Sequence, residues 1–299
     1  MTGNTIPERQ NSREMMRLLR ARSEIYRRAV IMQKAQLCCT VVVPVICAIV
    51  GLLAPATRPA VAALSLALVL LDIGLIDRSL KKGLKTAALV CEAFDCALLE
   101  MPWNRFATGK PVDPEVVANA DRRWPKGEAK LENWYPVIVG KAPIHVARVV
   151  CQRTNLWYDA KLREDYGRYL FLGAFLVVAA LVVAGLAVKL DFADFVATIL
   201  APATPIVGWA IREAFRQRDA AEAQRTTKSE ADALWELIVL GDCPTDECTR
   251  RSREFQNSIF QRRVGNPLIF PMIYDRLRDD MEQDMNLAAE VLLRQIGID

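Results

Sequence analysis

The chain has 299 residues, of which 52% are hydrophobic and 25% charged, and its formal net charge is +4. These averages match those of a soluble protein only because strongly apolar and strongly charged segments cancel in the mean. The first 25 residues are polar and rich in Arg and Glu, and no apolar core precedes Leu37, so we expect no cleavable secretory signal.

Residues 1–36 are predicted to form a cytoplasmic N-terminal helix. Apolar residues recur close to helical spacing from Met15 to Val30, and basic residues such as Arg20 and Lys34 lie on the polar side. Packing of this helix on the cytosolic domain is favoured over binding to the membrane surface.

Residues 37–76 are predicted to form a transmembrane hairpin. An uncharged stretch from about Leu37 to Leu53 is followed by a tight turn and by a second apolar stretch, from about Ala60 to Ile76. Each stretch approaches or reaches the roughly 17–25 apolar residues that a helix needs to cross the hydrocarbon core. Pro44 lies within the first stretch, where it removes a backbone hydrogen bond and can kink the helix.

Residues 77–168 are predicted to form a cytoplasmic middle region. A helix continues from the second span, a proline-rich loop region covers residues 101–140, and a further helix over residues 141–168 leads into the third span. Glu92, Asp95 and Glu100 are spaced for one face of a helix, and we expect that face to be solvated.

Residues 169–211 are predicted to form a second transmembrane hairpin. The third span, Tyr169 to Val188, is the most uniformly apolar segment of the chain. The fourth span runs from about Phe192 to Ile211, and Pro202 and Pro205 interrupt its middle.

Residues 212–299 are predicted to form cytoplasmic C-terminal helices. The helix of the fourth span continues to about Leu240, and two more helices follow at about residues 246–263 and 270–296. No strand-like alternation of apolar residues persists in the sequence. The predicted fold is all-α: a polytopic membrane protein with four transmembrane helices in two hairpins, plus a helical cytoplasmic domain built from the N-terminus, the middle loop and the C-terminus.

The distribution of basic residues predicts the orientation in the membrane. The two hairpin turns hold only Arg58 and Lys189, whereas thirteen basic residues lie near the opposite ends of the spans. Because cytoplasmic loops carry an excess of Lys and Arg, both termini and the middle region are predicted to be cytoplasmic. The thirteen are Arg27, Arg28, Lys34, Arg78, Lys81, Lys82, Lys85, Lys161, Arg163, Arg168, Arg212, Arg216 and Arg218.

The sequence carries no signature of an enzyme. It lacks the dinucleotide-binding, P-loop, nucleophile-elbow and zinc-protease motifs, and His145 is its single histidine. The eight cysteines include a loose pair at Cys243 and Cys248, but zinc sites want tighter spacing and more ligands. We therefore expect no enzymatic activity, no metal and no cofactor, and cysteines that are reduced cytosolic thiols.

Asp72 is a candidate for lining a pore. An ionisable group at membrane depth is costly and marks a functional site by default. Asp72 lies about one turn from the end of its span, so pore lining and simple contact with the membrane interface both remain open. One chain offers too little polar lining for a water-filled path, so a pore would need a homo-oligomer. Pro44, Pro202 and Pro205 are candidate positions for helix bending.

Short polar and aromatic motifs occur in order along the chain. They are Arg9-Gln10-Asn11, Phe94-Asp95 followed by Met101-Pro102-Trp103-Asn104, Trp134-Tyr135, Cys151 to Asp159 with Leu162-Arg163, and Ser252 to Phe260 with Arg263 and Pro267. With these motifs and the two hairpins, nearly the whole chain resembles the S-4TM family. Its members are pore-forming effectors, four-transmembrane proteins associated with SMODS and SLOG proteins in bacterial anti-phage defence.

The resemblance implies an effector of a CBASS-like system that acts in abortive infection at the bacterial inner membrane. A cyclic oligonucleotide from a cGAS-like nucleotidyltransferase, or a SLOG-type partner, would trigger the chain to permeabilise the lipid bilayer. No DNA partner is expected. The rival hypotheses are a regulated ion channel or transporter and a non-conducting membrane anchor for a soluble partner.

Donor-rich and aromatic residues of these motifs are candidates either for binding a ligand or for holding the cytoplasmic domain together. Arginine beside planar aromatic groups suits a nucleotide phosphate and base, but a hydrogen-bonded scaffold is slightly favoured. The candidates are Trp103, Asn104, Trp134, Tyr135, Gln152, Arg153, Asn155, Arg163, Arg253, Gln256, Asn257 and Arg263.

Overall fold

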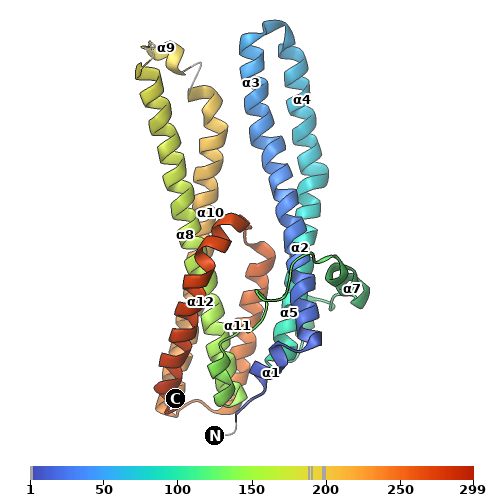
Figure 1. Ribbon diagram of the computed structural model, residues 1–299, viewed down its shortest axis with the longest axis vertical. Helices are drawn as coiled ribbons and strands as arrows, with labels where there is room; N and C mark the ends of the chain where they lie inside the picture. The colour runs from blue at the N-terminus through green and yellow to red at the C-terminus, as the bar shows by residue number, and fades with distance from the viewer. Residues whose placement is uncertain (1–2, 188, 190, 197–199) are drawn as a thin grey trace. The chain divides into compact units, whose positions relative to one another are not determined.

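A computed structural model describes residues 3–187, 189, 191–196 and 200–299. These residues form helices, turns and loops, and none of them lies in a strand, so the prediction of an all-α chain is confirmed. The helices in chain order, labelled in Figure 1, are α1 (Ile6–Gln10), α2 (Arg13–Leu37), η1 (Cys38–Val42), α3 (Val43–Leu53), η2 (Pro55–Thr57), α4 (Arg58–Leu71), η3 (Asp72–Ile76), α5 (Asp77–Leu98), α6 (Arg105–Thr108), α7 (Pro114–Arg123), η4 (Val137–Lys141), α8 (Ile144–Ala187), α9 (Phe192–Phe195), α10 (Ala201–Leu240), α11 (Thr245–Gly265) and α12 (Pro271–Arg294).

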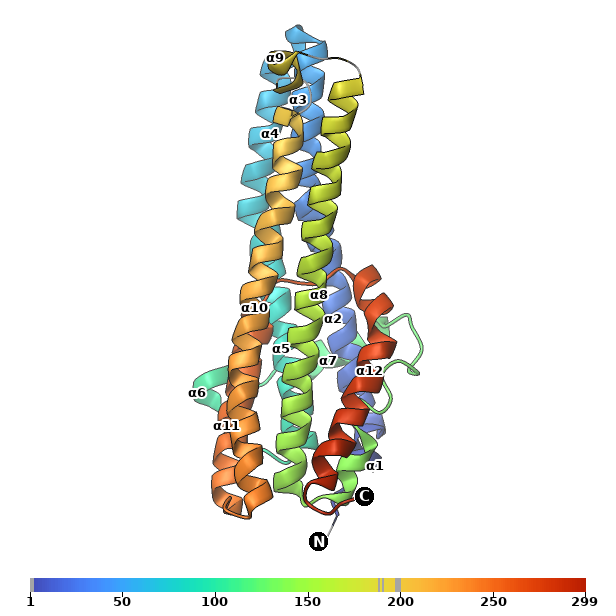
Figure 2. The ribbon, with the colours of Figure 1, turned by 90° about the vertical axis from the view of Figure 1, so that its left-hand side faces the viewer.

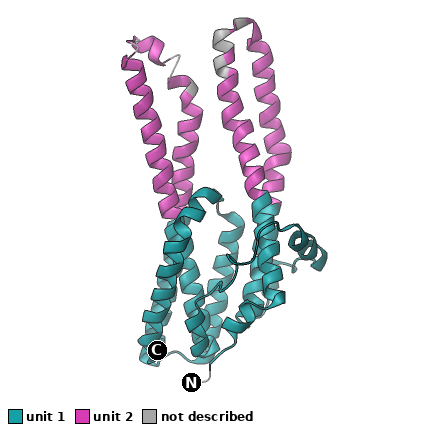
Figure 3. Cartoon of the chain, viewed as in Figure 1, with its two compact units in different colours: residues 1–28, 83–162, 220–299 teal, residues 29–82, 163–219 magenta. Residues whose placement is uncertain are grey.

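The chain divides into two compact units, coloured separately in Figure 3. Unit 1 comprises Met1–Arg28, Gly83–Leu162 and Ala220–Asp299, and unit 2 comprises Ala29–Lys82 and Arg163–Asp219. Each unit is therefore assembled from segments that are distant in sequence. The membrane boundaries at residues 37, 76, 169 and 211 stay predictions, as does the cytoplasmic location of the remaining segments.

The core of unit 1 is apolar and closely packed. Phe94, Leu98, Tyr135, Phe255 and Leu293 are almost completely buried in one cluster. Full burial of a large apolar side chain contributes roughly 1.5–3 kcal/mol, so this cluster supplies much of the stability of the unit. Pro271 lies in the first turn of α12, where its missing N–H costs no helical hydrogen bond, so the sequence itself favours the start of this helix.

Both ends of the chain pack on η4 within unit 1. The backbone N–H of Asn4 donates to the Gly140 carbonyl at 2.9 Å, and the Lys141 ammonium donates to the Asp299 carbonyl. Figures 1 and 2 show the two termini at the same end of this unit. Asn4 and Asp299, near the two ends of the chain, therefore both pack on the same short helix of unit 1.

Among the described residues, three long helical stretches are apolar enough to cross a membrane: Arg13–Cys47, Arg58–Leu98 and Ile144–Ala187. Within unit 2 they expose large apolar side chains, including Leu70 at 61%, Phe175 at 64% and Val183 at 65%. Water would penalise so much contiguous apolar surface, whereas lipid would not. The exposed apolar surface of these long helices therefore identifies the chain as a membrane protein.

The fourth predicted span, residues 192–211, corresponds to α9 and the beginning of α10. Residues 197–199 between these helices lie outside the described part of the chain, so the fourth span stays a prediction. Pro205 is inside α10, as the sequence indicated. Pro202 is the second residue of α10, close to the undescribed residues 197–199, so its interruption of the fourth span stays a prediction.

Pro44 follows a short π-helix in the first hairpin. The backbone N–H of Val43 donates to the Cys38 carbonyl, one residue further than in an α-helix. A second π-helical turn, Asp72–Ile76, lies on the other arm of the hairpin. Such turns loosen the regular hydrogen-bond ladder and often mark functional positions. The expected irregularity near Pro44 is therefore present as a change of helix type.

The predicted topology can be tested with single cysteines. Thr57 lies in the turn between α3 and α4, and Gly109 is an exposed residue of the middle region. In intact cells, an impermeant maleimide should label a cysteine introduced at Thr57 and not one at Gly109. After permeabilisation both should be labelled, and the parent chain corrects for native cysteines. Labelling at Gly109 in intact cells would contradict the two-hairpin topology; the equivalent position Leu190 lies outside the described residues.

Candidate functional site

Two carboxylates on α5 form the centre of a buried network in unit 1. The side chains of Glu92 and Asp95 are 0% and 1% exposed, so the expectation that this helix face is solvated is wrong for these two residues. Arg253 of α11 donates to Glu92, and the Arg263 guanidinium donates to the Asp95 carboxylate at 2.5 Å. Charges this far from water are tolerated only when they are paired.

Amide and hydroxyl groups complete the interior network. Gln256 Nε2 donates to Glu92 and to Asp95, at 2.9 Å in each case. Gln152 Nε2 donates to Gln256 Oε1 at 3.1 Å, and Ser252 Oγ donates back to Gln152 Oε1 at 2.7 Å. These contacts join α5, α8 and α11, and the amides of Gln152 and Gln256 each donate and accept.

Tyr135 ties the loop before η4 to this network. Its hydroxyl donates to Asp95 Oδ1 at 2.8 Å, and its backbone N–H donates to Gln10 Oε1 at 2.9 Å. Burial and the neighbouring Asp95 carboxylate raise the pKa of Tyr135 well above its ordinary value, so the phenol remains a donor. Gln10 is buried as well and returns a hydrogen bond from Nε2 to the Tyr135 carbonyl.

We use the name interior network for Gln10, Glu92, Asp95, Tyr135, Gln152, Ser252, Arg253, Gln256 and Arg263. Among the described residues, none of its buried side-chain polar atoms lacks a hydrogen-bond partner. A satisfied, close-packed network offers a ligand no free donor. The geometry of these residues is that of a scaffold, the role that the sequence slightly favoured for them.

Other sequence candidates also have internal partners. Asn104 caps α6 by accepting from the backbone N–H groups of Phe106 and Ala107, and its own amide donates to Asn257 at 3.3 Å. Trp103 Nε1 donates to the Gly109 carbonyl at 2.9 Å. Asn104 therefore links the start of α6 to α11, and Trp103 links the two ends of the segment that contains α6.

Arg153 and Arg163 lie on α8 but belong to different units. Arg153 Nε donates to Asp232 of α10 at 2.6 Å within unit 1. Arg163 Nη1 donates to Gln217 at 2.8 Å within unit 2, and Gln217 in turn donates to the buried Glu213. The structure therefore does not bring Arg163 into one site with the other candidates.

An aromatic recess of about 270 Å³ opens on unit 1 between the loop before η4, α8 and α12. It brings together the sequence candidates Trp134, Tyr135 and Asn155. Its lining is Glu132, Asn133, Trp134, Tyr135, Asn155, Tyr158, Tyr274, Arg278, Glu282, Met285 and Asn286. The α12 residues of this recess were not singled out in the sequence, because nothing local marks them as neighbours of α8.

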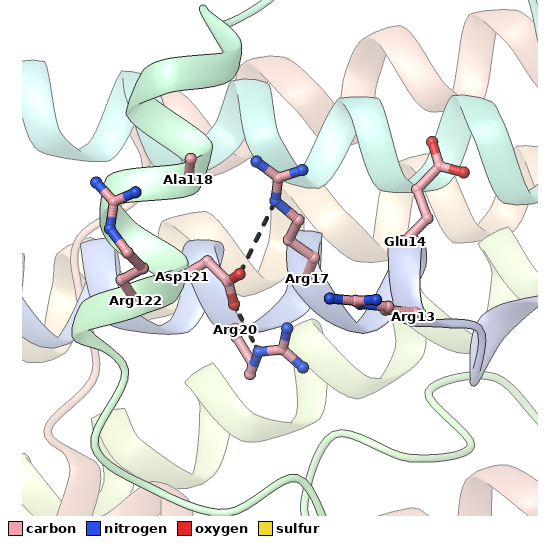
Figure 4. Close-up of a pocket in the computed structure, with 7 residues that line it drawn as sticks. All are labelled: Arg13, Glu14, Arg17, Arg20, Ala118, Asp121 and Arg122. Carbon is pink, nitrogen blue, oxygen red and sulfur yellow. Dashed lines mark hydrogen bonds and ion pairs between the residues drawn. The ribbon is translucent and has the colours of Figure 1, made fainter.

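A basic recess of about 530 Å³ lies between α2 and α7 and is drawn in Figure 4. Arg20 Nε donates to Asp121 at 2.6 Å, and Arg17 Nε approaches the same carboxylate at 3.9 Å. Arg13 and Arg122 form no ion pair with any described residue. The lining is Arg13, Glu14, Arg17, Arg20, Ala118, Asp121 and Arg122, so positive charge exceeds negative charge.

Asp72 begins the π-helical turn η3 in unit 2. Its Oδ1 atom is buried and accepts no hydrogen bond within the described part of the chain. An unpaired carboxylate in an apolar hairpin is costly in lipid. This position therefore still stands out as a pore candidate, together with the helix irregularities near Pro44 and Pro205.

Cys243 and Cys248 form a disulfide, so the prediction of reduced thiols is wrong for this pair. α11 begins at Thr245 and carries Cys248 around its first turn, which brings the two Cα atoms to 6.2 Å, within bridging distance. The other six cysteines are free. Within the described residues, no cluster of three or more His, Cys, Asp or Glu side chains is arranged for a metal ion.

These features define an α-helical membrane protein in which unit 1 is held together by a buried charged network. A family profile described as the SMODS-associating 4TM effector domain matches residues 4–292, and the chain belongs to this family. The resemblance seen in the sequence motifs is thereby confirmed.

One curated relative is a protein of Bacillus cereus (strain VD146) named as a probable CBASS effector molecule. It is 23% identical to this chain over 299 residues, which cover 96% of this chain and 97% of the relative. No solved structure matches the chain.

Proposed function

We propose that the chain is an anti-phage effector that permeabilises the bacterial inner membrane when unit 1 receives a cyclic-nucleotide signal. The observation that carries this proposal is the family match over residues 4–292, which includes both the apolar helices and the hydrogen-bonded unit. The full-length similarity to a relative named as a CBASS effector supports the defence role.

The division of the chain supports a separation of sensing from membrane damage. Unit 1 offers two recesses with chemically distinct linings, and unit 2 exposes long apolar helices. The helices α2, α5, α8 and α10 contribute residues to both units, so each unit is covalently continuous with the other through several helices. A ligand that binds the resting and active conformations of unit 1 unequally would shift their populations.

The basic recess suits the phosphate groups of such a signal. Arginine forms short, charge-assisted and often bidentate hydrogen bonds with phosphate oxygens. Arg13 and Arg122 have no acidic partner among the described residues and are the side chains available for that purpose. The signal would come from a cGAS-like nucleotidyltransferase, or a SLOG-type partner would convey it.

Permeabilisation would require several copies of the chain. The hairpin helices present mainly apolar surface, with Leu66, Leu70 and Ile73 more than half exposed. A water-filled path needs polar groups that one such hairpin does not supply. Association of copies around Asp72, and bending near Pro44 and Pro205, would provide them.

Reconstitution into liposomes tests the proposal. The purified full-length chain is inserted into dye-loaded vesicles of bacterial polar lipids and exposed separately to cyclic dinucleotides and cyclic trinucleotides. We expect dye release only after one of these nucleotides is added, and chemical crosslinking of several copies at the same time. Release without any nucleotide would instead favour a constitutive channel. An intact membrane with every nucleotide and partner would favour a non-conducting anchor.

A further inference from the structure

The aromatic recess contains two buried polar atoms without a hydrogen-bond partner among the described residues, the Tyr158 hydroxyl and the side-chain amide nitrogen of Asn155. The Nδ2 atom of Asn155 is buried and has no hydrogen-bond partner among the described residues. Three residues earlier on the same helix, the Gln152 amide is fully paired. Buried amides are almost always satisfied, because an unmet donor loses its bond to water without compensation. A hydrogen-bond acceptor on a ligand in the recess would therefore satisfy the unpaired amide nitrogen of Asn155.

The walls of the recess are planar and held in place. Trp134 is fixed from one side by the Arg22 guanidinium, which lies 4.3 Å from its ring centroid. Tyr135 is fixed by its bonds to Gln10 and Asp95. Tyr158 is half-buried, its hydroxyl oxygen is buried close to Tyr274, and desolvation is the main cause that raises its pKa. Preorganised aromatic faces bind flat rings at a small entropic cost.

The charges of the recess exclude a phosphate as its occupant. Arg278 is its only basic lining residue, and the guanidinium is already bonded to the Glu282 carboxylate and to the Lys130 carbonyl. Glu132 adds a second carboxylate to the lining. A recess with two carboxylates and one committed arginine attracts a neutral group and not an anion.

We infer that the aromatic recess binds a planar nitrogen heterocycle of the nucleobase class, whose acceptor edge receives a hydrogen bond from Asn155. The volume of about 270 Å³ is below the roughly 300–1,000 Å³ of pockets that enclose whole drug-sized ligands, so it fits one ring system. This inference rests on the proposed function insofar as the base belongs to the nucleotide signal. The free nucleoside is the other source of the same chemistry.

Binding measurements on the full-length chain in detergent test the inference. The probes are the four ribonucleosides and, separately, cyclic di-AMP and cyclic di-GMP. We expect at least one probe to bind, and Asn155→Leu to weaken that binding about tenfold or more, the loss of one buried hydrogen bond. Because Asn155 makes no internal hydrogen bond, Asn155→Leu should leave the thermal unfolding midpoint of the unliganded protein unchanged or higher.

Asn104→Leu is the matched control, since Asn104 caps α6 and lies outside the recess. It should lower the unfolding midpoint and leave the affinity unchanged, the opposite pattern. Binding of nucleosides alone would identify the free nucleoside as the occupant, and binding of cyclic dinucleotides alone would identify the nucleotide signal.

Three results would overturn the inference: no probe binds, Asn155→Leu binds as well as the parent, or Asn155→Leu lowers the midpoint as Asn104→Leu does. If nucleotides trigger dye release equally in the parent and in Asn155→Leu, the recess assignment fails and the proposed function stands. If binding depends on Asn155 but no nucleotide triggers release, the recess assignment stands and the proposed function fails.

Discussion

Replacing Asp95 with alanine is expected to destabilise the folded chain by about 3–5 kcal/mol, the cost of removing one partner from a buried ion pair. The Asp95 side chain is 1% exposed and accepts hydrogen bonds from Arg263, Gln256 and Tyr135. The substitution leaves the guanidinium and the phenol facing an apolar methyl group. Few single substitutions in this chain should cost more.

The measurement is urea unfolding in mild detergent, followed by tryptophan fluorescence. Arg250→Ala is the matched control, because Arg250 forms ion pairs with Glu247 and Glu254 on the exposed surface of α11. Surface ion pairs contribute little, so this variant should unfold like the parent. Equal midpoints for Asp95→Ala and the parent would mean that the interior network does not stabilise unit 1.

Leu176→Arg is expected to make membrane insertion of the third span less favourable by about 2.5–3.5 kcal/mol, the cost of arginine near the centre of a transmembrane helix. Leu176 lies on α8 and is 56% exposed. A soluble helix would accept arginine at such a position with almost no penalty. The size of the effect therefore reports on whether lipid surrounds this side chain.

The fraction of full-length chain that resists carbonate extraction from membranes gives the readout. Leu240→Arg is the control, because Leu240 is 71% exposed but belongs to unit 1. It should remain fully membrane-integrated, whereas Leu176→Arg should be partly extracted. Identical extraction of the two variants would contradict a transmembrane role for the segment around Leu176.

Because many residues of the family motifs hold unit 1 together, they are poor candidates for binding a ligand. Gln152, Arg253, Gln256 and Arg263 are committed to one another and to carboxylates on α5. Substituting them would unfold unit 1 and abolish activity without any role in recognition. The two recesses are the better targets. The amide nitrogen of Asn155 in one has no hydrogen-bond partner, and Arg13 and Arg122 in the other form no ion pair, among the described residues.

The sequence by itself determined the class of the protein. Helical content, the apolar stretches and the family motifs follow from local composition and order, since an apolar segment long enough to cross a bilayer must be helical in lipid. The same local information placed Tyr169–Val188 on a single long helix, which the structure extends to Ile144–Ala187. The position of Pro205 within a helix also depends only on nearby residues, and the structure agrees with that expectation.

Only the tertiary structure decided which polar residues are used internally. Glu92 and Asp95 have the spacing of a solvated helix face, and they are buried because arginines more than 150 residues later fold against them. No periodicity within one helix encodes a partner at that separation. Gln152 and Asn155 illustrate the same point on one helix, since one amide meets α11 and the other faces a recess beside α12. Hydrogen bonding depends on what a neighbouring helix brings within about 3 Å, and that is set by packing.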